Sequence, residues 1–170
     1  MVRERPLKPR VLVFGREPLP GTVKTRLAAD IGDQEAARVY ELLLRNTLEV
    51  ASASGADVEL WLADAPSSRF RATLNVSIAV QRGEDIGERM ADAFERCFEG
   101  GSEGVVLIGS DCPLIEVRHI HEAAAALDDH AVVLGPAEDG GYWLVAQRTP
   151  GVDLFSDVPW SHESTLATTR

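Results

Sequence analysis

The sequence contains few cysteines and no long hydrophobic run. Cys97 and Cys112 are its only cysteines in 170 residues, which excludes a disulfide framework or a paired Cys-x-x-Cys metal site. No apolar run approaches the roughly 18 residues that a membrane-spanning helix requires. The N-terminal region lacks the apolar segment and cleavage site of a secretion signal. We therefore expect a cytoplasmic protein with reduced thiols and no membrane span.

Positive charge is also scarce. The chain has 17 Lys and Arg against 27 Asp and Glu, a net charge of -10. This balance argues against a broad basic surface, and we expect no nucleic-acid partner. The few cations are concentrated, because residues 1–26 carry seven Lys or Arg against two Glu. A positive start on an acidic chain suits a small anionic ligand that is held locally.

The length and a composition of 45% hydrophobic and 26% charged residues are typical of one globular domain, which we expect over residues 1–170. Stretches that are apolar throughout alternate with amphipathic ones, as in a parallel sheet covered on both sides. We predict a doubly wound α/β fold with a mostly parallel central sheet and helices on both faces. The predicted strands are Val11–Phe14, Val58–Ala63, Val76–Val80, Val105–Ile108, Ala131–Leu134 and Tyr142–Ala146. The predicted helices begin at an Asp33 N-cap, at an Asp85 N-cap, after Pro113 and near Trp160.

The segment after the first predicted strand is the first candidate binding site. In an open parallel sheet, ligands bind beyond the carboxyl ends of the strands, near the point where the strand order reverses. Gly15 and Gly21 allow the backbone to approach a phosphate, and Lys24 and Arg26 supply charge-assisted hydrogen bonds to its oxygens. The spacing is not that of a Walker A loop, which requires Gly-Lys-Ser/Thr. We predict a nucleotide-diphosphate site here; a solvated turn is the alternative.

Two acids follow later strands. Asp111 comes directly after Val105–Ile108 and is a candidate ligand for Mg²⁺ or Mn²⁺, which prefer oxygen donors; the alternative is a helix cap. Asp139 precedes a pair of glycines after the fifth strand, and is a candidate second metal contact or general base. The alternative for Asp139 is an Asp-Gly hairpin turn.

A fourth segment follows the third predicted strand. Gln81 could hydrogen-bond a base or a phosphate. Arg89 lies in the first turn of the next predicted helix, where it could bind the same ligand or pair with Asp85 or Glu88. We include Gln81 and Arg89 among the candidate nucleotide-binding residues.

Five ordered blocks, which span nearly the whole chain, resemble a bacterial family of the nucleotide-diphospho-sugar transferase superfamily, with a GT-A-like fold. Some members of that family are described as glycosyltransferases of arsenosugar biosynthesis and others only as a domain of unknown function. The blocks are PLPGTVKTRL at 18–27, QRGEDIGERM at 81–90, GSDCPLI at 109–115, GPAEDGGYWLVA at 135–146 and FSDVPWS at 155–161.

The resemblance implies roles for individual residues. Lys24 and Arg26 would hold the nucleotide diphosphate, and Asp111 would stand where GT-A proteins keep a metal-binding acid. Only one acid of a DxD motif is present, so Asp139 is the expected second functional carboxylate. Tyr142 and Trp160 would form the wall of an acceptor pocket.

The resemblance implies a glycosyltransferase that uses a nucleotide-sugar donor, a small acceptor and Mg²⁺ or Mn²⁺. One alternative is a nucleotidyltransferase similar to guanylyltransferases that act on phosphorylated small molecules, although the chain lacks their LxGGxSxRxG-like first loop. The other is an inactive nucleotide-binding homologue. Family members tend to continue into a further helix and an acidic stretch, so we expect a chain that is truncated at its C-terminus or an inactive relative.

Overall fold

A computed structural model describes residues 8–169. The outermost parts of the predicted single domain, residues 1–7 and Arg170, lie outside the described residues. Within residues 8–169 no helix is long and apolar enough to cross a membrane. The helices and strands, in chain order, are β1 Arg10–Gly15, α1 Thr25–Ile31, α2 Asp33–Ala53, β2 Asp57–Leu62, α3 Ser68–Arg71, β3 Ser77–Val80, α4 Ile86–Glu99, β4 Val105–Gly109, α5 Val117–Ala126, β5 Val132–Pro136, β6 Tyr142–Gln147 and α6 Thr165–Thr168.

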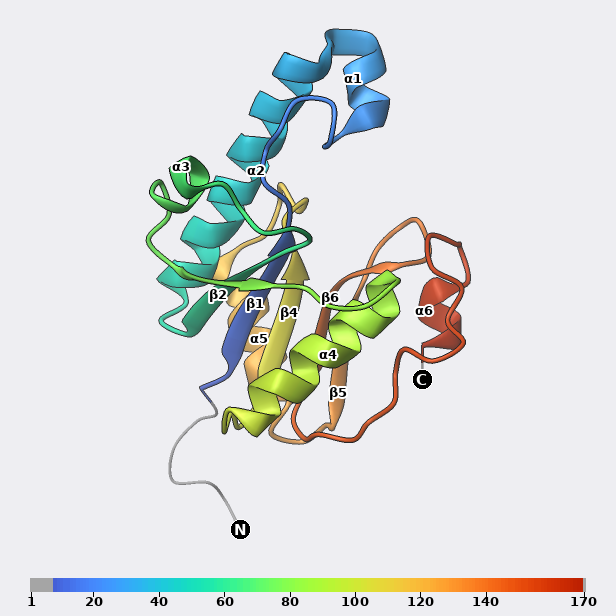
Figure 1. The fold of residues 1–170 in the computed structure, drawn as a ribbon. Helices are drawn as coiled ribbons and strands as arrows, with labels where there is room; N and C mark the ends of the chain where they lie inside the picture. The colour runs from blue at the N-terminus through green and yellow to red at the C-terminus, as the bar shows by residue number, and fades with distance from the viewer. Residues whose placement is uncertain (1–7, 170) are drawn as a thin grey trace.

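The sheet has the strand order β3-β2-β1-β4-β6-β5 (Figure 1). Strands β3, β2, β1 and β4 are parallel, and β6 runs antiparallel to both β4 and β5. The predicted doubly wound and mostly parallel fold is confirmed. The chain leaves β1 toward β2 and β3 on one side, and returns to β4 on the other. The carboxyl ends of β1 and β4 therefore form the point where the strand order reverses.

Both faces of the sheet are covered, as the wholly apolar strands predict. In β1, Val11 and Val13 belong to a core with α2 and α5. The alternate residues Leu12 and Phe14 belong to a second core with α4 and the segment around Phe155. Successive side chains of a strand point to opposite faces, so a strand between two helical layers must be apolar on both. Figure 1 shows α4 on the near side of the sheet and α5 behind it.

The helix starts differ from the prediction at α1 and at α2. The sequence analysis missed α1, which contains no buried residue and therefore has no apolar stripe to reveal it. The predicted N-cap Asp33 is the first helical residue of α2, and the N-cap is Gly32, with φ of 85°. In contrast, Asp85 does cap α4, since its carboxylate accepts a hydrogen bond from the Glu88 N–H at 2.9 Å.

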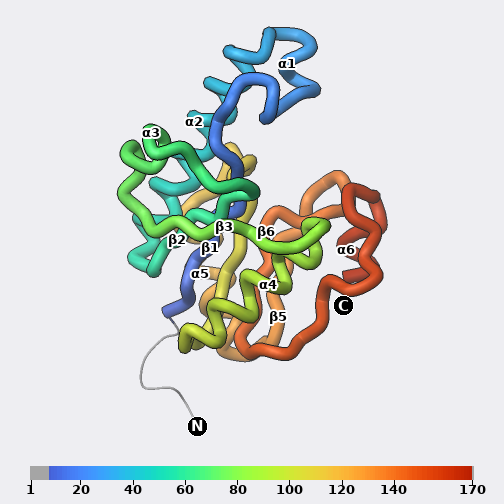
Figure 2. The backbone as a smooth tube through the Cα atoms, in the orientation of Figure 1, coloured from blue at the N-terminus to red at the C-terminus, as the bar shows by residue number. Residues whose placement is uncertain are grey.

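The C-terminal segment is mostly irregular. Only Thr165–Thr168 is helical in the region where a helix near Trp160 was predicted. Figure 2 traces this segment, coloured red, beside β5 and β6. The Leu166 N–H donates to the Gly140 carbonyl at 2.8 Å, which ties the segment to the β5–β6 loop.

Candidate functional site

Two adjoining cavities open at the carboxyl ends of the parallel strands. Their volumes are about 330 Å³ and about 510 Å³, and Phe14 and Ile86 line both. They are called here the small cavity and the large cavity. Of the residues predicted for the site, the small cavity is lined by Gly15, Lys24, Gln81, Arg89 and Asp111. The large cavity is lined by Arg26, Asp139, Tyr142 and Trp160. Gly21 lines neither cavity.

Lys24 and Asp111 meet in the small cavity. The Lys24 ammonium group forms an ion pair with the Asp111 carboxylate, and their side chains are 27% and 53% exposed. Lys24 has φ of 49° and ψ of 42°, which is the left-handed region. Non-glycine residues in this region store strain, which is common at functional sites. The helix-cap alternative for Asp111 is wrong, because Glu116 is the N-cap of the next helix. Of the two cations of the predicted turn, Lys24 is paired with Asp111, whereas Arg26 is exposed.

Tyr40 and Ser110 bridge the segments that carry Lys24 and Asp111. The Tyr40 hydroxyl of α2 accepts a hydrogen bond from the Arg16 N–H at 2.9 Å, directly after β1. The same oxygen lies 2.8 Å from Ser110 Oγ, directly after β4. The segments that follow β1 and β4 are thus joined through the Tyr40 hydroxyl oxygen.

Gln81 and Arg89 form another part of the small-cavity wall, and each holds a backbone carbonyl. The Gln81 amide nitrogen donates to the Trp61 carbonyl at 2.8 Å, and its side chain is nearly buried. Arg89 Nε donates to the Gly83 carbonyl at 3.0 Å. Among the residues described, Arg89 makes no ion pair with Asp85 or Glu88, so the predicted alternative is wrong.

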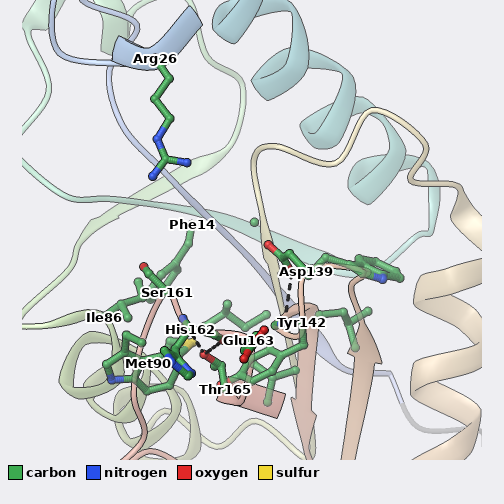
Figure 3. Close-up of a pocket in the computed structure, with 17 residues that line it drawn as sticks. Phe14, Arg26, Ile86, Met90, Asp139, Tyr142, Ser161, His162, Glu163 and Thr165 are labelled. Carbon is green, nitrogen blue, oxygen red and sulfur yellow. Dashed lines mark hydrogen bonds between the residues drawn. The ribbon is translucent and has the colours of Figure 1, made fainter. Parts of the chain in front are cut away.

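The large cavity has apolar and aromatic walls with a polar rim. Figure 3 shows Arg26 extending toward it from α1, while Tyr142, His162 and Glu163 lie on its other side. Burial raises the pKa of Tyr142 above the ordinary phenol value. Its hydroxyl oxygen is buried and lacks a well-formed hydrogen bond among the described residues.

The Asp139 loop is a hairpin connection, as the alternative reading predicted. It joins the antiparallel strands β5 and β6, and Asp139 Oδ1 accepts a hydrogen bond from the Gly141 N–H at 3.1 Å. Gly140 has φ of +84°, and a Cβ on it would lie 2.0 Å from the Glu163 carbonyl oxygen. Gly140 therefore lets the C-terminal segment approach the hairpin. Asp139 nevertheless lines the large cavity (Figure 3).

Trp160 fills a gap left by a glycine on α4. A Cβ on Gly87 would lie 2.6 to 2.8 Å from three atoms of the Trp160 indole ring. The Trp160 ring also contacts Tyr142, at a centroid distance of 6.5 Å with an edge-to-face orientation. Gly87 and Tyr142 thus fix one wall of the large cavity.

The chain offers few ligands for a metal ion. Within residues 8–169, no three His, Cys, Asp or Glu side chains are grouped so that they could hold one. Asp111 offers a single carboxylate, on which the Lys24 ammonium group stands in for a cation. Mg²⁺ is often bound by one or two carboxylates together with substrate phosphates and water. A single carboxylate could thus hold such an ion only together with oxygens of a phosphorylated ligand and water.

Several polar residues that line the two cavities were not among the predicted site residues, including Arg16, Tyr40, Ser110 and Glu163. Tyr40 lies within the apolar stripe of α2, where a buried phenol usually finds a hydrogen-bond partner. Ser110 and Glu163 carried no spacing signal. Arg16 was counted only in the basic N-terminal region.

The comparisons with known proteins agree with this fold. A family model described as "Uncharacterized protein conserved in bacteria (DUF2064)" matches residues 46–162. The crystal structure of a candidate nucleotide-diphospho-sugar transferase from Desulfovibrio desulfuricans G20 has a TM-score of 0.89 and 30% identity, and the match covers 96% of this chain and 74% of that one.

Two further matches are to a guanylyltransferase and a cytidylyltransferase. A 2-phospho-L-lactate guanylyltransferase of Methanocaldococcus sp. (strain FS406-22) is 26% identical over 121 residues, which are 71% of this chain. The match spans 51% of that curated relative, about half of its length. A cytidylyltransferase from Leptospira borgpetersenii shares the fold, with a TM-score of 0.51, 14% identity, and coverage of 84% of this chain and 60% of that one. The chain therefore has a fold of the nucleotidyltransferase and nucleotide-diphospho-sugar transferase type.

Proposed function

The chain belongs to the bacterial family described by DUF2064, and from its paired cavities we propose that it transfers a sugar from a nucleotide-diphosphate donor to a small hydroxylated acceptor. The observation that carries this proposal is the unequal distribution of charge between the two cavities. The small cavity has three cationic side chains, from Arg16, Lys24 and Arg89, and one carboxylate, from Asp111. In a chain with a net charge of -10, this excess favours a polyanionic ligand such as a diphosphate.

The large cavity has the opposite balance. Asp139 and Glu163 line it together with Arg26 and His162, against a wall that includes Trp160. Carboxylates accept hydrogen bonds from hydroxyl groups and repel phosphates, and an aromatic wall offers an apolar surface to a ring. This lining supports an uncharged, hydroxylated acceptor over a phosphorylated one.

The proposed reaction assigns a role to each group. The acceptor oxygen forms a bond to the anomeric carbon of the donor sugar, and its proton passes to the Asp139 carboxylate. The bond between the anomeric carbon and the diphosphate oxygen breaks, and its electron pair leaves with the nucleoside diphosphate. Lys24, Arg89 and Arg26 would stabilise the negative charge that develops on the departing diphosphate.

Asp111 is the residue proposed to hold Mg²⁺ or Mn²⁺, together with oxygens of the bound diphosphate. Such an ion, when bound, would neutralise negative charge on the departing diphosphate. Lys24 would then turn from the Asp111 carboxylate to the phosphate oxygens, because an ammonium group cannot share one carboxylate closely with a second cation.

A thermal-shift panel tests the proposal. Nucleoside diphosphates, nucleotide sugars and nucleoside triphosphates are compared, each with and without Mn²⁺. A ligand that binds only the folded state stabilises it by about 2.7 kcal/mol at 100 times its Kd. We expect nucleotide sugars and diphosphates to raise the Tm, and donor to be consumed when the acceptor is present. No stabilisation by any nucleotide would reject the proposal.

Nucleotidyl transfer to a phosphorylated acceptor is the second candidate, favoured by the 26% identity to a guanylyltransferase. It predicts that a nucleoside triphosphate alone stabilises the protein strongly and that pyrophosphate is released. Binding without turnover in either assay would instead support the inactive homologue.

A further inference from the structure

Ser110 is a buried hydroxyl group in the wall of the small cavity. Its side chain is 5% exposed, and it lies between the end of β4 and Asp111. It shares the cavity with the cationic side chains of Arg16, Lys24 and Arg89. A hydroxyl in this position faces the space where the proposed function locates an anionic ligand.

The Tyr40 phenol is the hydrogen-bond partner of the Ser110 hydroxyl, and either oxygen could be the donor. Tyr40 has one O–H hydrogen, and its oxygen already accepts the Arg16 N–H at 2.9 Å. The phenol can therefore donate to Ser110 Oγ, which lies 2.8 Å away. Ser110 Oγ then serves as the acceptor in this bond, and its own hydrogen is available for another partner.

The backbone at Gly15 keeps these two oxygens in place. A Cβ on Gly15 would lie 3.1 Å from Ser110 Oγ and 3.1 Å from the Tyr40 hydroxyl oxygen. Glycine at this position thus allows β1 to pack closely against the hydrogen-bonded pair. Ser110 itself lines the small cavity, where a bound ligand can accept its hydrogen.

We propose that Ser110 donates its hydroxyl hydrogen to a phosphate oxygen of the bound nucleotide, and that Tyr40 is the positioning residue that holds Ser110 in the donor orientation. This inference rests on the proposed function of the small cavity. Hydrogen bonds from a hydroxyl to an ionised oxygen are short and strong. One donor of this kind, fixed before binding, would complement the flexible Lys24 and Arg89 side chains.

The test measures binding of inorganic pyrophosphate, UDP and GDP by titration calorimetry to the full chain and to Ser110→Ala and Tyr40→Phe variants. We expect Ser110→Ala to weaken pyrophosphate binding about tenfold or more, since the bond involves a charged acceptor. Tyr40→Phe is expected to weaken it less, because the hydroxyl remains but loses its orientation. The matched control is Thr47→Val on the same helix, which removes a buried hydroxyl bonded to the Leu43 carbonyl, remote from the cavity.

The double variant Tyr40→Phe/Ser110→Ala separates positioning from a general structural effect. If Tyr40 acts through Ser110, Tyr40→Phe costs less affinity in the Ser110→Ala background than in the wild-type chain. Additive losses, or equal losses with Thr47→Val, would overturn the assignment of Tyr40. Unchanged pyrophosphate binding in Ser110→Ala would overturn the assignment of Ser110.

The same titrations distinguish failure of this inference from failure of the proposed function. If Lys24→Ala weakens pyrophosphate binding and Ser110→Ala does not, the diphosphate site is supported and the proposed Ser110 hydrogen bond is rejected. A wild-type chain that binds neither pyrophosphate nor UDP nor GDP rejects both. Urea unfolding of each variant confirms that the chains compared are folded.

Discussion

The Lys24 ammonium group and the Asp111 carboxylate form an ion pair, although 87 residues separate them in the chain. Lys24 follows β1 and Asp111 follows β4, and these strands are parallel neighbours in the sheet. A basic and an acidic side chain are thus brought together at the point where the strand order reverses. The pair offers one group for phosphate and one for a cation, which is the basis for the first two predictions.

Replacing Lys24 separates its role in binding from its backbone strain. Lys24→Ala and Lys24→Gly both remove the ammonium group, and we expect each to weaken UDP or GDP binding about tenfold. Glycine tolerates the left-handed conformation at φ of 49°. Lys24→Gly should therefore be more stable than Lys24→Ala, by about 1 kcal/mol in the free energy of unfolding. Calorimetry and urea unfolding measure the two effects. If either variant binds UDP or GDP with wild-type affinity, Lys24 does not contribute to nucleotide binding.

Replacing Asp111 with Asn removes the negative charge with little change in shape. We expect Asp111→Asn to abolish the part of the nucleotide-induced Tm increase that depends on Mn²⁺, while the part without Mn²⁺ remains, because the cationic side chains are intact. Asp57→Asn is a suitable control, since Asp57 is an exposed acid at the amino end of β2, whereas the cavities lie at the carboxyl ends of the parallel strands. An unchanged Mn²⁺ effect in Asp111→Asn would exclude Asp111 as the metal ligand.

Gly87→Ala tests the contact between α4 and Trp160. Alanine favours a helix over glycine by up to about 1 kcal/mol. The added methyl group would overlap the indole ring, however, at 2.6 to 2.8 Å. Overpacking of this kind typically costs about 1–3 kcal/mol, so we expect a net loss of stability and a displaced Trp160. In a Trp160→Ala background the clash is absent, and Gly87→Ala should be neutral or stabilising. Thermal unfolding and tryptophan fluorescence provide the measurements.

Cys97 gives the protein a dependence on alkaline pH. Burial raises the pKa of the Cys97 thiol from about 9 to about 11. As pH rises through this range, the unfolded chain loses the thiol proton before the folded chain does, so the free energy of unfolding falls. A shift of this size corresponds to a loss on the order of 2 kcal/mol.

The measurement for Cys97 is denaturant unfolding at pH 8 and pH 10.5. Cys97→Ala should lose less stability than the wild-type chain between these two values, because it lacks the ionising group. If both proteins lose the same amount, the alkaline dependence originates from other groups.

Much of the fold could be predicted because the signals are local. Val11–Phe14 and Val105–Ile108 are apolar at every position, and a strand covered on both faces requires that pattern. The exposed helix α1 carries no such pattern and was missed. The strand direction of β6 was not specified either, because periodicity indicates a strand but not which neighbour it pairs with.

The candidate site was only partly predictable. The strand-end rule led to Lys24 and Asp111, since both directly follow buried strands or their loops. Tyr40 does not follow this rule, because it lies on a helix, and only the fold shows that its hydroxyl joins the segments after β1 and β4. Ser110 follows β4 directly, but only the fold pairs its hydroxyl with Tyr40. Asp139 was predicted with Lys24 as part of one site, but the structure assigns it to the neighbouring cavity.

Residue order alone predicted that this chain forms alternating strands and helices and which candidate residues follow the strand ends, because burial and helix capping depend on residues that are close in sequence. Only the tertiary structure decided which strand ends are neighbours. It joined Lys24 to Asp111 in the small cavity, brought Asp139 into the large cavity, and gave the small cavity most of the cationic side chains. The physical reason is that contacts across a sheet are set by strand order and packing, which no local pattern encodes.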